Sequence, residues 1–468
     1  MENFSNFISD LSSWLWGYPL LILLFGTHIF LTFRLGFVQR YIGKAIRLSV
    51  TRDKHSHGDV SQFSALATAL AATIGTGNIV GVATAIALGG PGSIMWIWLT
   101  GILGISTKYA EGLLAVKYRV KREDGSIAGG PMYYLQYGLK NQKLGKILGV
   151  LFAAFAAIAA FGIGSSTQSN SIQSAVFTTF NFAENVSIFG ITVQTKIIIG
   201  IALAIVSGLV IIGGIKSIAR VSEKIVPFMA AFYVAGCLFI LITGYDTLLD
   251  TISLICSQAF SLKAVGGGAA GTIIMLAARY GVARGLFSNE SGLGSAAIVA
   301  AAARTRNPVR QALVSSTGTF WDTVIICALT GLAIVNTGAY KSGLTGFELT
   351  RVAFAEIPLG EIILGIALLM FAFTTIIGWS YYSEKSIEYL FGRKSVLPYK
   401  IVYLFMVFVG AVFSIDLIWN FSDITNGLMA IPNLIALILL SGVVAAETKK
   451  YLKNNNIDKH SEEEIIKL

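Results

Sequence analysis

Long apolar stretches alternate with short polar connections along the whole chain. Runs of about 20 mainly apolar residues, the length at which a helix crosses a bilayer, recur at eleven places. They lie near 15–35, 63–88, 91–116, 147–178, 195–214, 224–243, 268–302, 309–337, 360–383, 399–417 and 424–444. The pattern predicts an all-α polytopic membrane protein with eleven transmembrane helices.

Two of these runs are interrupted by glycine. The second contains Gly-Thr-Gly-Asn at 75–78, and the seventh contains Gly-Leu-Gly at 292–294. Glycine lowers helix stability by roughly 1 kcal/mol relative to alanine, and unwound backbone at membrane depth persists only where protein buries it or water reaches it. Such glycines can also serve only for close helix packing. We predict that both runs are broken helices whose freed peptide groups hold a small polar solute.

The positions of the breaks predict internal symmetry. If spans two to six form one repeat and spans seven to eleven another, each break falls in the first helix of its repeat. Because five spans is an odd number, the two repeats are inverted in the membrane, and the first span is an accessory helix. The predicted organisation is an external N-terminus, accessory helix and basic cytoplasmic loop (1–60), a first inverted repeat (61–245), an external amphipathic segment (246–265), a second inverted repeat (266–445) and a solvated cytoplasmic tail (446–468).

Composition and charge support a membrane location. Hydrophobic residues make up 54% of the chain and charged residues only 13%, against roughly 25% charged residues in soluble domains. Most lysines and arginines fall in alternate connections, which predicts by the positive-inside rule that the N-terminus is outside and the C-terminus cytoplasmic. The net charge of +10 is therefore a topology signal and does not indicate nucleic-acid binding. We expect a multi-pass protein of the cell membrane, surrounded by lipid.

The breaks offer two complementary kinds of ligand. A half-helix that begins at a break presents N–H groups to a carboxylate, and one that ends there presents carbonyls to a cation. The adjacent hydroxyls of Thr374 and Thr375 could complete a cation shell or bond their own backbone. Gln168 could bond a ligand or a neighbouring helix.

Charged residues inside the runs are further candidates. Ionisable groups at mid-membrane cost on the order of 3 kcal/mol and usually face the interior or water, so Arg284 and Glu290 are gating candidates. Lys108 and Glu111, three residues apart on one helical face, are expected to pair with each other.

Other classes of function lack their signatures. No strand precedes the glycines at 75–77, so they do not form a nucleotide loop. The four histidines occur without a metal motif, and no acid and base pair is recognisable, which argues against an enzyme and against a cofactor. A channel would need a continuous polar pore, whereas two inverted breaks favour an occluding site.

Five motifs carry a resemblance to a known family. They are Ala-Leu-Ala-Ala-Thr-Ile-Gly-Thr-Gly-Asn at 69–78, Lys-Tyr-Ala-Glu at 108–111, Gly-Gly-Pro-Met-Tyr-Tyr at 129–134, Phe-Ser-Asn-Glu-Ser-Gly-Leu-Gly-Ser at 287–295 and Gly-Trp-Ser-Tyr-Tyr at 378–382. With these motifs the chain resembles the sodium:alanine symporter family, also called the alanine or glycine:cation symporters. The resemblance implies a LeuT-like five-plus-five fold and sodium-driven uptake of small neutral amino acids such as alanine and glycine.

The resemblance also implies a site. It assigns the substrate to Thr76, Gly77, Asn78, Gln168, Phe287 and Trp379, with the substrate carboxylate on the backbone near Thr76 and Gly77. It assigns a sodium ion to the carbonyls of Ala71 and Ile74 and the hydroxyls of Thr374 and Thr375. One departure is Ser291, where alanine is common in the family. Proton coupling through Glu290 remains the alternative to sodium coupling.

Overall fold

The structure is a computed structural model that describes residues 2–51, 58–188, 191–260, 269–413, 416–461 and 465–467. It is almost entirely helical. The helices of the first half are α1 Glu2–Leu15, α2 Tyr18–Leu35, α3 Ile42–Ser49, α4 Gln62–Thr73, α5 Val82–Gly89, α6 Ser93–Lys117, α7 Pro131–Gly138, α8 Gln142–Ala159, α9 Thr167–Phe180, α10 Thr195–Ile211, α11 Gly214–Thr243 and α12 Leu248–Phe260. Those of the second half are α13 Ala269–Asn289, α14 Ser295–Ala301, α15 Pro308–Thr319, α16 Ala328–Asn336, α17 Gly346–Phe354, α18 Gly360–Phe391, α19 Val396–Val412, α20 Asp416–Leu439 and α21 Ser441–Thr448.

Short π-helical segments join several of these helices. They are η2 Gly77–Gly81 between α4 and α5, η3 Ala160–Ser166 between α8 and α9, η6 Phe320–Cys327 between α15 and α16, and η9 Lys449–Lys453 after α21. Such π-turns add residues to a helix without ending it and often occur at functional sites. The segments η3 and η6 therefore join α8 to α9 and α15 to α16 into long, locally widened helices.

The predicted apolar runs coincide with helix, but the number of spans is only partly supported. Among the described residues, six helices are long and apolar enough to cross a membrane. The number rises to eight if two bent helix pairs each count as one span, namely Gln62–Thr73 with Gly77–Gly89 and Asp423–Leu439 with Ser441–Lys453. The apolar helix α10 is shorter than these. The chain is thus a helical protein of membrane type, and the count of eleven spans stays a prediction.

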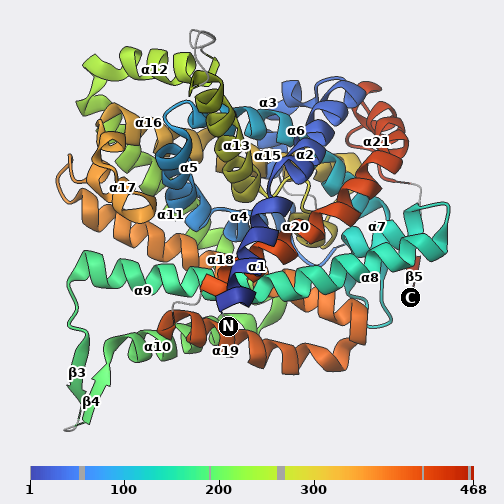
Figure 1. The fold of residues 1–468 in the computed structure, drawn as a ribbon. Helices are drawn as coiled ribbons and strands as arrows, with labels where there is room; N and C mark the ends of the chain where they lie inside the picture. Colours follow the sequence, from blue (N-terminus) through green and yellow to red (C-terminus); the bar gives the residue numbers. More distant parts are fainter. Residues whose placement is uncertain are drawn as a thin grey trace.

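The helices cross one another in a single bundle, and α12 and the β3–β4 hairpin lie at its edges (Figure 1). The described strands form two small sheets, with β1 Val120–Lys121, β2 Ile127–Ala128 and β5 Ile466–Lys467 in one, and β3 Asn185–Ile188 paired with β4 Ile191–Gln194 in the other. The segment expected to be amphipathic is the helix α12, while 261–268 lies outside the described residues. Whether α12 lies outside the membrane stays a prediction.

The described part of the tail is mostly exposed, as expected, but several of its residues are bound to the protein. Tyr451, Leu452 and Ile457 are buried, and β5 pairs in parallel with β1, with Val120 opposite Ile466 and Lys121 opposite Lys467. The segment is rich in Lys, Asn and Glu, and its composition alone resembles a solvated tail. Its few apolar residues and its backbone instead find partners on the folded protein.

Candidate substrate and ion site

The two interrupted segments lie against each other. At the breaks, a Cβ at Gly77 would lie 3.4 Å from Ser288 Cα at the end of α13. At one end of the bundle, the backbone N–H of Asp59 donates to Ala302 O at 2.8 Å, and that of Arg304 donates to Val60 O at 2.8 Å. The breaks therefore meet in the protein interior, as broken helices that form one site must.

The first break has a defined hydrogen-bond pattern. Helix α4 ends at Thr73, and Ile74 has an extended ψ of 93°. The N–H of Gly75 donates to Asn78 Oδ1 at 2.9 Å, so it does not donate to Ala71 O as it would in a continuous helix. The carbonyls of Ala71 and Ile74 are thereby released from the helix, while Thr76 and Gly77 begin the next half-helix with N–H groups that have no place in its ladder.

Two of the predicted polar side chains lie at this break. A Cβ at Gly75 would lie 2.5 Å from Thr375 Oγ1 and 3.5 Å from Gln168 Oε1. Within the described part of the chain, Gln168 Oε1 is buried without a hydrogen-bond partner. The hydroxyls of Thr374 and Thr375 both donate to Phe371 O at 3.0 Å, the backbone bond that the sequence left open. The Thr374 hydroxyl also lies 3.5 Å from Met229 Sδ. The side chains of Gln168 and Thr375, but not that of Thr374, therefore converge on Gly75.

A carboxyl group that the sequence analysis missed fixes the first break. Asn78 Nδ2 donates to Asp322 Oδ1 at 2.7 Å, and the hydroxyls of Ser288 and Thr323 donate to Asp322 Oδ2 at 3.0 and 2.6 Å. Asp322 is fully buried in η6. The available signal was an acidic residue inside the apolar run 309–337, since such residues are functional candidates by default.

The second break is built from left-handed backbone. Glu290, Gly292 and Gly294 have φ of 54°, 93° and 85°, a region that glycine enters without steric cost. A Cβ at Gly292 would also lie 2.6 Å from Leu24 Cδ2. Both glycines are thus required by the turn between α13 and α14.

Glu111 occupies the start of α14. Its Oε1 accepts the N–H groups of Gly292 and Gly294 at 2.9 and 3.0 Å and Asn433 Nδ2 at 2.7 Å. Among the described contacts it makes no ion pair with Lys108, so the expected pairing of these two residues is wrong. The positive end of α14 therefore already holds a carboxylate of the protein.

The gating candidate Glu290 and the pocket candidate Trp379 form one unit. Trp379 Nε1 donates to Glu290 Oε1 at 2.9 Å, and the Ser295 hydroxyl bonds Glu290 Oε2. Arg284 lies one helical turn before Phe287, with its guanidinium 5.8 Å from the centre of that ring. The ring of Phe287 lies 3.6 Å from the position that a Cβ at Gly77 would occupy, so Phe287 flanks the first break.

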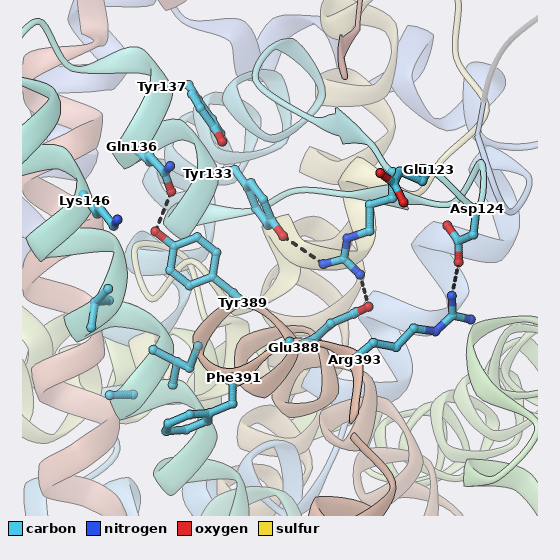
Figure 2. Close-up of a pocket in the computed structure, with 15 residues that line it drawn as sticks. Glu123, Asp124, Tyr133, Gln136, Tyr137, Lys146, Glu388, Tyr389, Phe391 and Arg393 are labelled. Atoms are coloured by element: carbon cyan, nitrogen blue, oxygen red, sulfur yellow. Dashed lines mark hydrogen bonds and ion pairs between the residues drawn. The ribbon is translucent and has the colours of Figure 1, made fainter. Parts of the chain in front are cut away.

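A separate cavity of about 940 Å³ opens between α7, α8, the β1–β2 connection and the end of α18. Figure 2 shows Tyr133, Glu388 and Tyr389 gathered around it. Arg122 donates to Tyr133 at 3.0 Å and pairs with Glu388, while Tyr389 donates to Gln136 Oε1 at 2.7 Å. None of its lining residues belongs to either break, so this cavity is distinct from the candidate site.

Two broken helices meet inside an apolar helical bundle, an arrangement that is typical of secondary transporters. The fold is similar to that in the crystal structure of MhsT in complex with L-phenylalanine, with a TM-score of 0.56 and 13% identity over 83% of this chain and 98% of that one. The chain belongs to the sodium:alanine symporter family, whose profile matches residues 1–465. It is therefore a transporter and not an enzyme.

Relatives match over nearly their whole length. The chain is 50% identical to the sodium/alanine symporter AgcS of Methanococcus maripaludis, covering 96% of this chain and 97% of that protein. It is also 50% identical to an uncharacterized transporter of Haemophilus influenzae, covering 99% of each. A probable sodium/glutamine symporter of Bacillus subtilis, GlnT, is 36% identical over 98% of this chain and 92% of that one.

Proposed function

We propose that this protein takes up alanine, and also glycine, together with sodium by alternating access, using eleven spans arranged as an accessory helix and two inverted repeats of five. The N-terminus is outside and the C-terminus cytoplasmic. The observation that carries the proposal is the unequal filling of the two breaks. Glu111 fills the N-terminal end of α14, and the N–H groups at Thr76 and Gly77 are left for an incoming carboxylate.

The substrate carboxylate binds at Thr76 and Gly77. These residues begin a half-helix whose positive end attracts an anion, and Asn78 is held beside them by Asp322. Gln168 Oε1, buried and unpaired within the described residues, accepts a hydrogen bond from the substrate ammonium. Phe287 and Trp379 limit the volume left for the side chain, so small amino acids are preferred.

The sodium ion binds at the carbonyl end of α4. Small hard cations prefer several oxygen ligands, and the carbonyls of Ala71 and Ile74 together with the Thr375 hydroxyl supply them. Thr374 completes the shell after its hydroxyl turns away from Met229. Because sodium and substrate bind on opposite sides of one unwound turn, each stabilises the conformation that the other needs, and linkage makes their mutual effect on affinity equal.

The experiment is uptake of labelled alanine into liposomes that contain the purified protein. An inward sodium gradient should drive accumulation, glycine should compete, and choline in place of sodium should abolish it. One charge crossing 100 mV supplies roughly 2.3 kcal/mol, so an imposed negative interior should increase accumulation. Uptake that ignores the sodium gradient would refute the proposal.

Proton coupling is the second candidate because Glu290 is a buried acid at the second break. Accumulation driven by a pH gradient in the absence of sodium would support it. Replacing Glu290 by glutamine keeps an acceptor for Trp379 Nε1 and removes the titrating group. Sodium-driven uptake that survives in this variant would exclude Glu290 as the coupling group.

Replacing Thr375 by valine is expected to raise the sodium concentration for half-maximal uptake about tenfold or more. The change keeps the shape of the side chain and removes one sodium ligand, and polar contacts to a charge contribute roughly 1.5–3 kcal/mol. Thr375→Ser, which keeps the hydroxyl, is the matched control and should stay near wild type. Equal sodium dependence in all three proteins would remove Thr375 from the sodium site.

Replacing Trp379 by phenylalanine is expected to broaden substrate selection and to lower alanine affinity. The smaller ring enlarges the pocket, and Glu290 loses its indole donor, now 2.9 Å away. Competition of labelled alanine uptake by leucine and methionine measures the change. Trp321→Phe, at a half-exposed position, is the control, and an inhibition profile identical to wild type would exclude Trp379 from the pocket wall.

A further inference from the structure

The C-terminal segment is bound to the chain between α14 and α15. Asn307 Nδ2 donates to the carbonyls of Ile457 and Lys459, both at 2.8 Å. The backbone N–H of Ser461 donates to Arg306 O at 2.8 Å. The side chain of Ile457 is 4% exposed, so the segment is anchored by an apolar residue as well as by backbone bonds.

A charged link continues from this segment to the start of α4. Arg310 Nη1 pairs with Asp458 Oδ1 at 2.7 Å, and Arg310 Nε donates to Gln62 Oε1 at 3.2 Å. Gln62 is the first residue of α4, directly after the Val60–Ala303 contact. The tail thus reaches the start of the first broken segment through one arginine.

The last described residues, Ile466 and Lys467, contact a third part of the protein. Strand β5 pairs with β1, and β2, on the other side of β1, is followed by α7. The connection after β1 is itself held to the end of α18 by the ion pair of Arg122 with Glu388. Residues 457–461 and 466–467 therefore contact the segment before α15, the start of α4 through Arg310, and strand β1.

We propose that residues 457–461 and 465–467 form a strap that holds the cytoplasmic side closed and limits how often the transporter opens inward. The inference rests on the alternating access and orientation proposed above. For substrate to leave through this face, the ends of α4 and α14 must separate, and the strap bonds to Asn307 and Arg310 restrain the segment that joins α14 to α15. Weakening the strap should increase the population of the inward-open state.

The experiment measures access to Ala65, which is 1% exposed on α4 and lies opposite Val299 and Ala300. Ala65→Cys is labelled with a membrane-impermeant maleimide in nanodiscs, where both faces are reachable. The background carries Cys256→Ser, and the same protein without Ala65→Cys gives the blank. Three strap variants, each made in the Ala65→Cys protein, are compared with that protein. They are truncation after Asn456, Asp458→Asn, and the double variant Asn307→Asp with Asp458→Asn.

Asn307→Asp is chosen because it keeps Oδ1, the acceptor that caps α15 through the N–H of Arg310 at 2.9 Å, and removes both donors to the strap. Lys459→Gln is the matched control, since it changes charge on the strap at an exposed side chain. Labelling is expected to accelerate at least about fivefold in the truncation and the double variant, less in Asp458→Asn, and not in Lys459→Gln.

Labelling rates within twofold of wild type in the double variant would overturn the strap, whatever the truncated chain does. Asp458 is 72% exposed in its side chain, so its replacement tests the strap without disturbing the core. Labelling does not require transport. Faster labelling of the strap variants, together with no sodium-driven uptake by the wild type, would support the strap and refute the proposed function. Sodium-driven uptake by the wild type, together with unchanged labelling of the variants, would support the proposed function and refute the strap.

Discussion

Glu111→Ala is expected to give a protein that melts at a much lower temperature and transports no alanine. The substitution removes the acceptor of three buried donors, the N–H groups of Gly292 and Gly294 and the amide of Asn433. Each unsatisfied buried donor costs about 1–3 kcal/mol, so the loss is about 3 kcal/mol or more. Thermal unfolding of the purified protein and alanine uptake measure the two effects.

Two variants separate the contact from the charge. Glu111→Gln keeps an oxygen in place and should retain most of the stability, whereas Glu123→Ala, at an exposed position, should change neither measurement. If Glu111→Ala melts at the wild-type temperature, the carboxylate does not hold the start of α14. The N–H groups at Thr76 and Gly77 would then not be distinguished from those of the second break as the ones left for the substrate.

Asp322→Ala is expected to reduce alanine uptake at limiting substrate about ten- to a hundredfold while the protein still folds. It removes the partner of Asn78, and also of Ser288 and Thr323, so the amide that holds Gly75 is free to turn. The hydrogen bond that acts on the site is the one from Asn78, and the loss of one such bond to a charged group, about 1.5–3 kcal/mol, corresponds to roughly one to two powers of ten.

A binding measurement shows whether the effect is on the site. Alanine with sodium should raise the melting temperature of the wild type, and this ligand-induced rise should disappear in Asp322→Ala. The melting temperature measured without ligands should fall less in Asp322→Ala than in Glu111→Ala. Asp250→Ala, on the exposed side of α12, is the matched control. A ligand-induced shift equal to that of wild type would show that Asp322 supports only the fold.

Local composition identified the two breaks. Glycine within an apolar run is costly enough to mark both interruptions, and Asn78 lies beside one of them, whereas Gln168 and Thr375 were assigned through the family resemblance. The contribution of Glu111 could not be found in this way, because its three partners lie more than 180 residues away along the chain. The pairing with Lys108 was expected from helix spacing alone, and that spacing says nothing about a competing partner on another helix.

The amino-acid sequence by itself determined that the chain is a helical membrane protein of this family and that two of its helices are broken. These properties depend on hydropathy and on glycine, which act within a few residues of one another. Only the tertiary structure decided that the breaks meet, that Asp322 holds one and Glu111 fills the other, and that the tail is bound. Each of these depends on hydrogen bonds between distant segments, and such bonds form only where packing brings a buried donor and acceptor within about 3 Å.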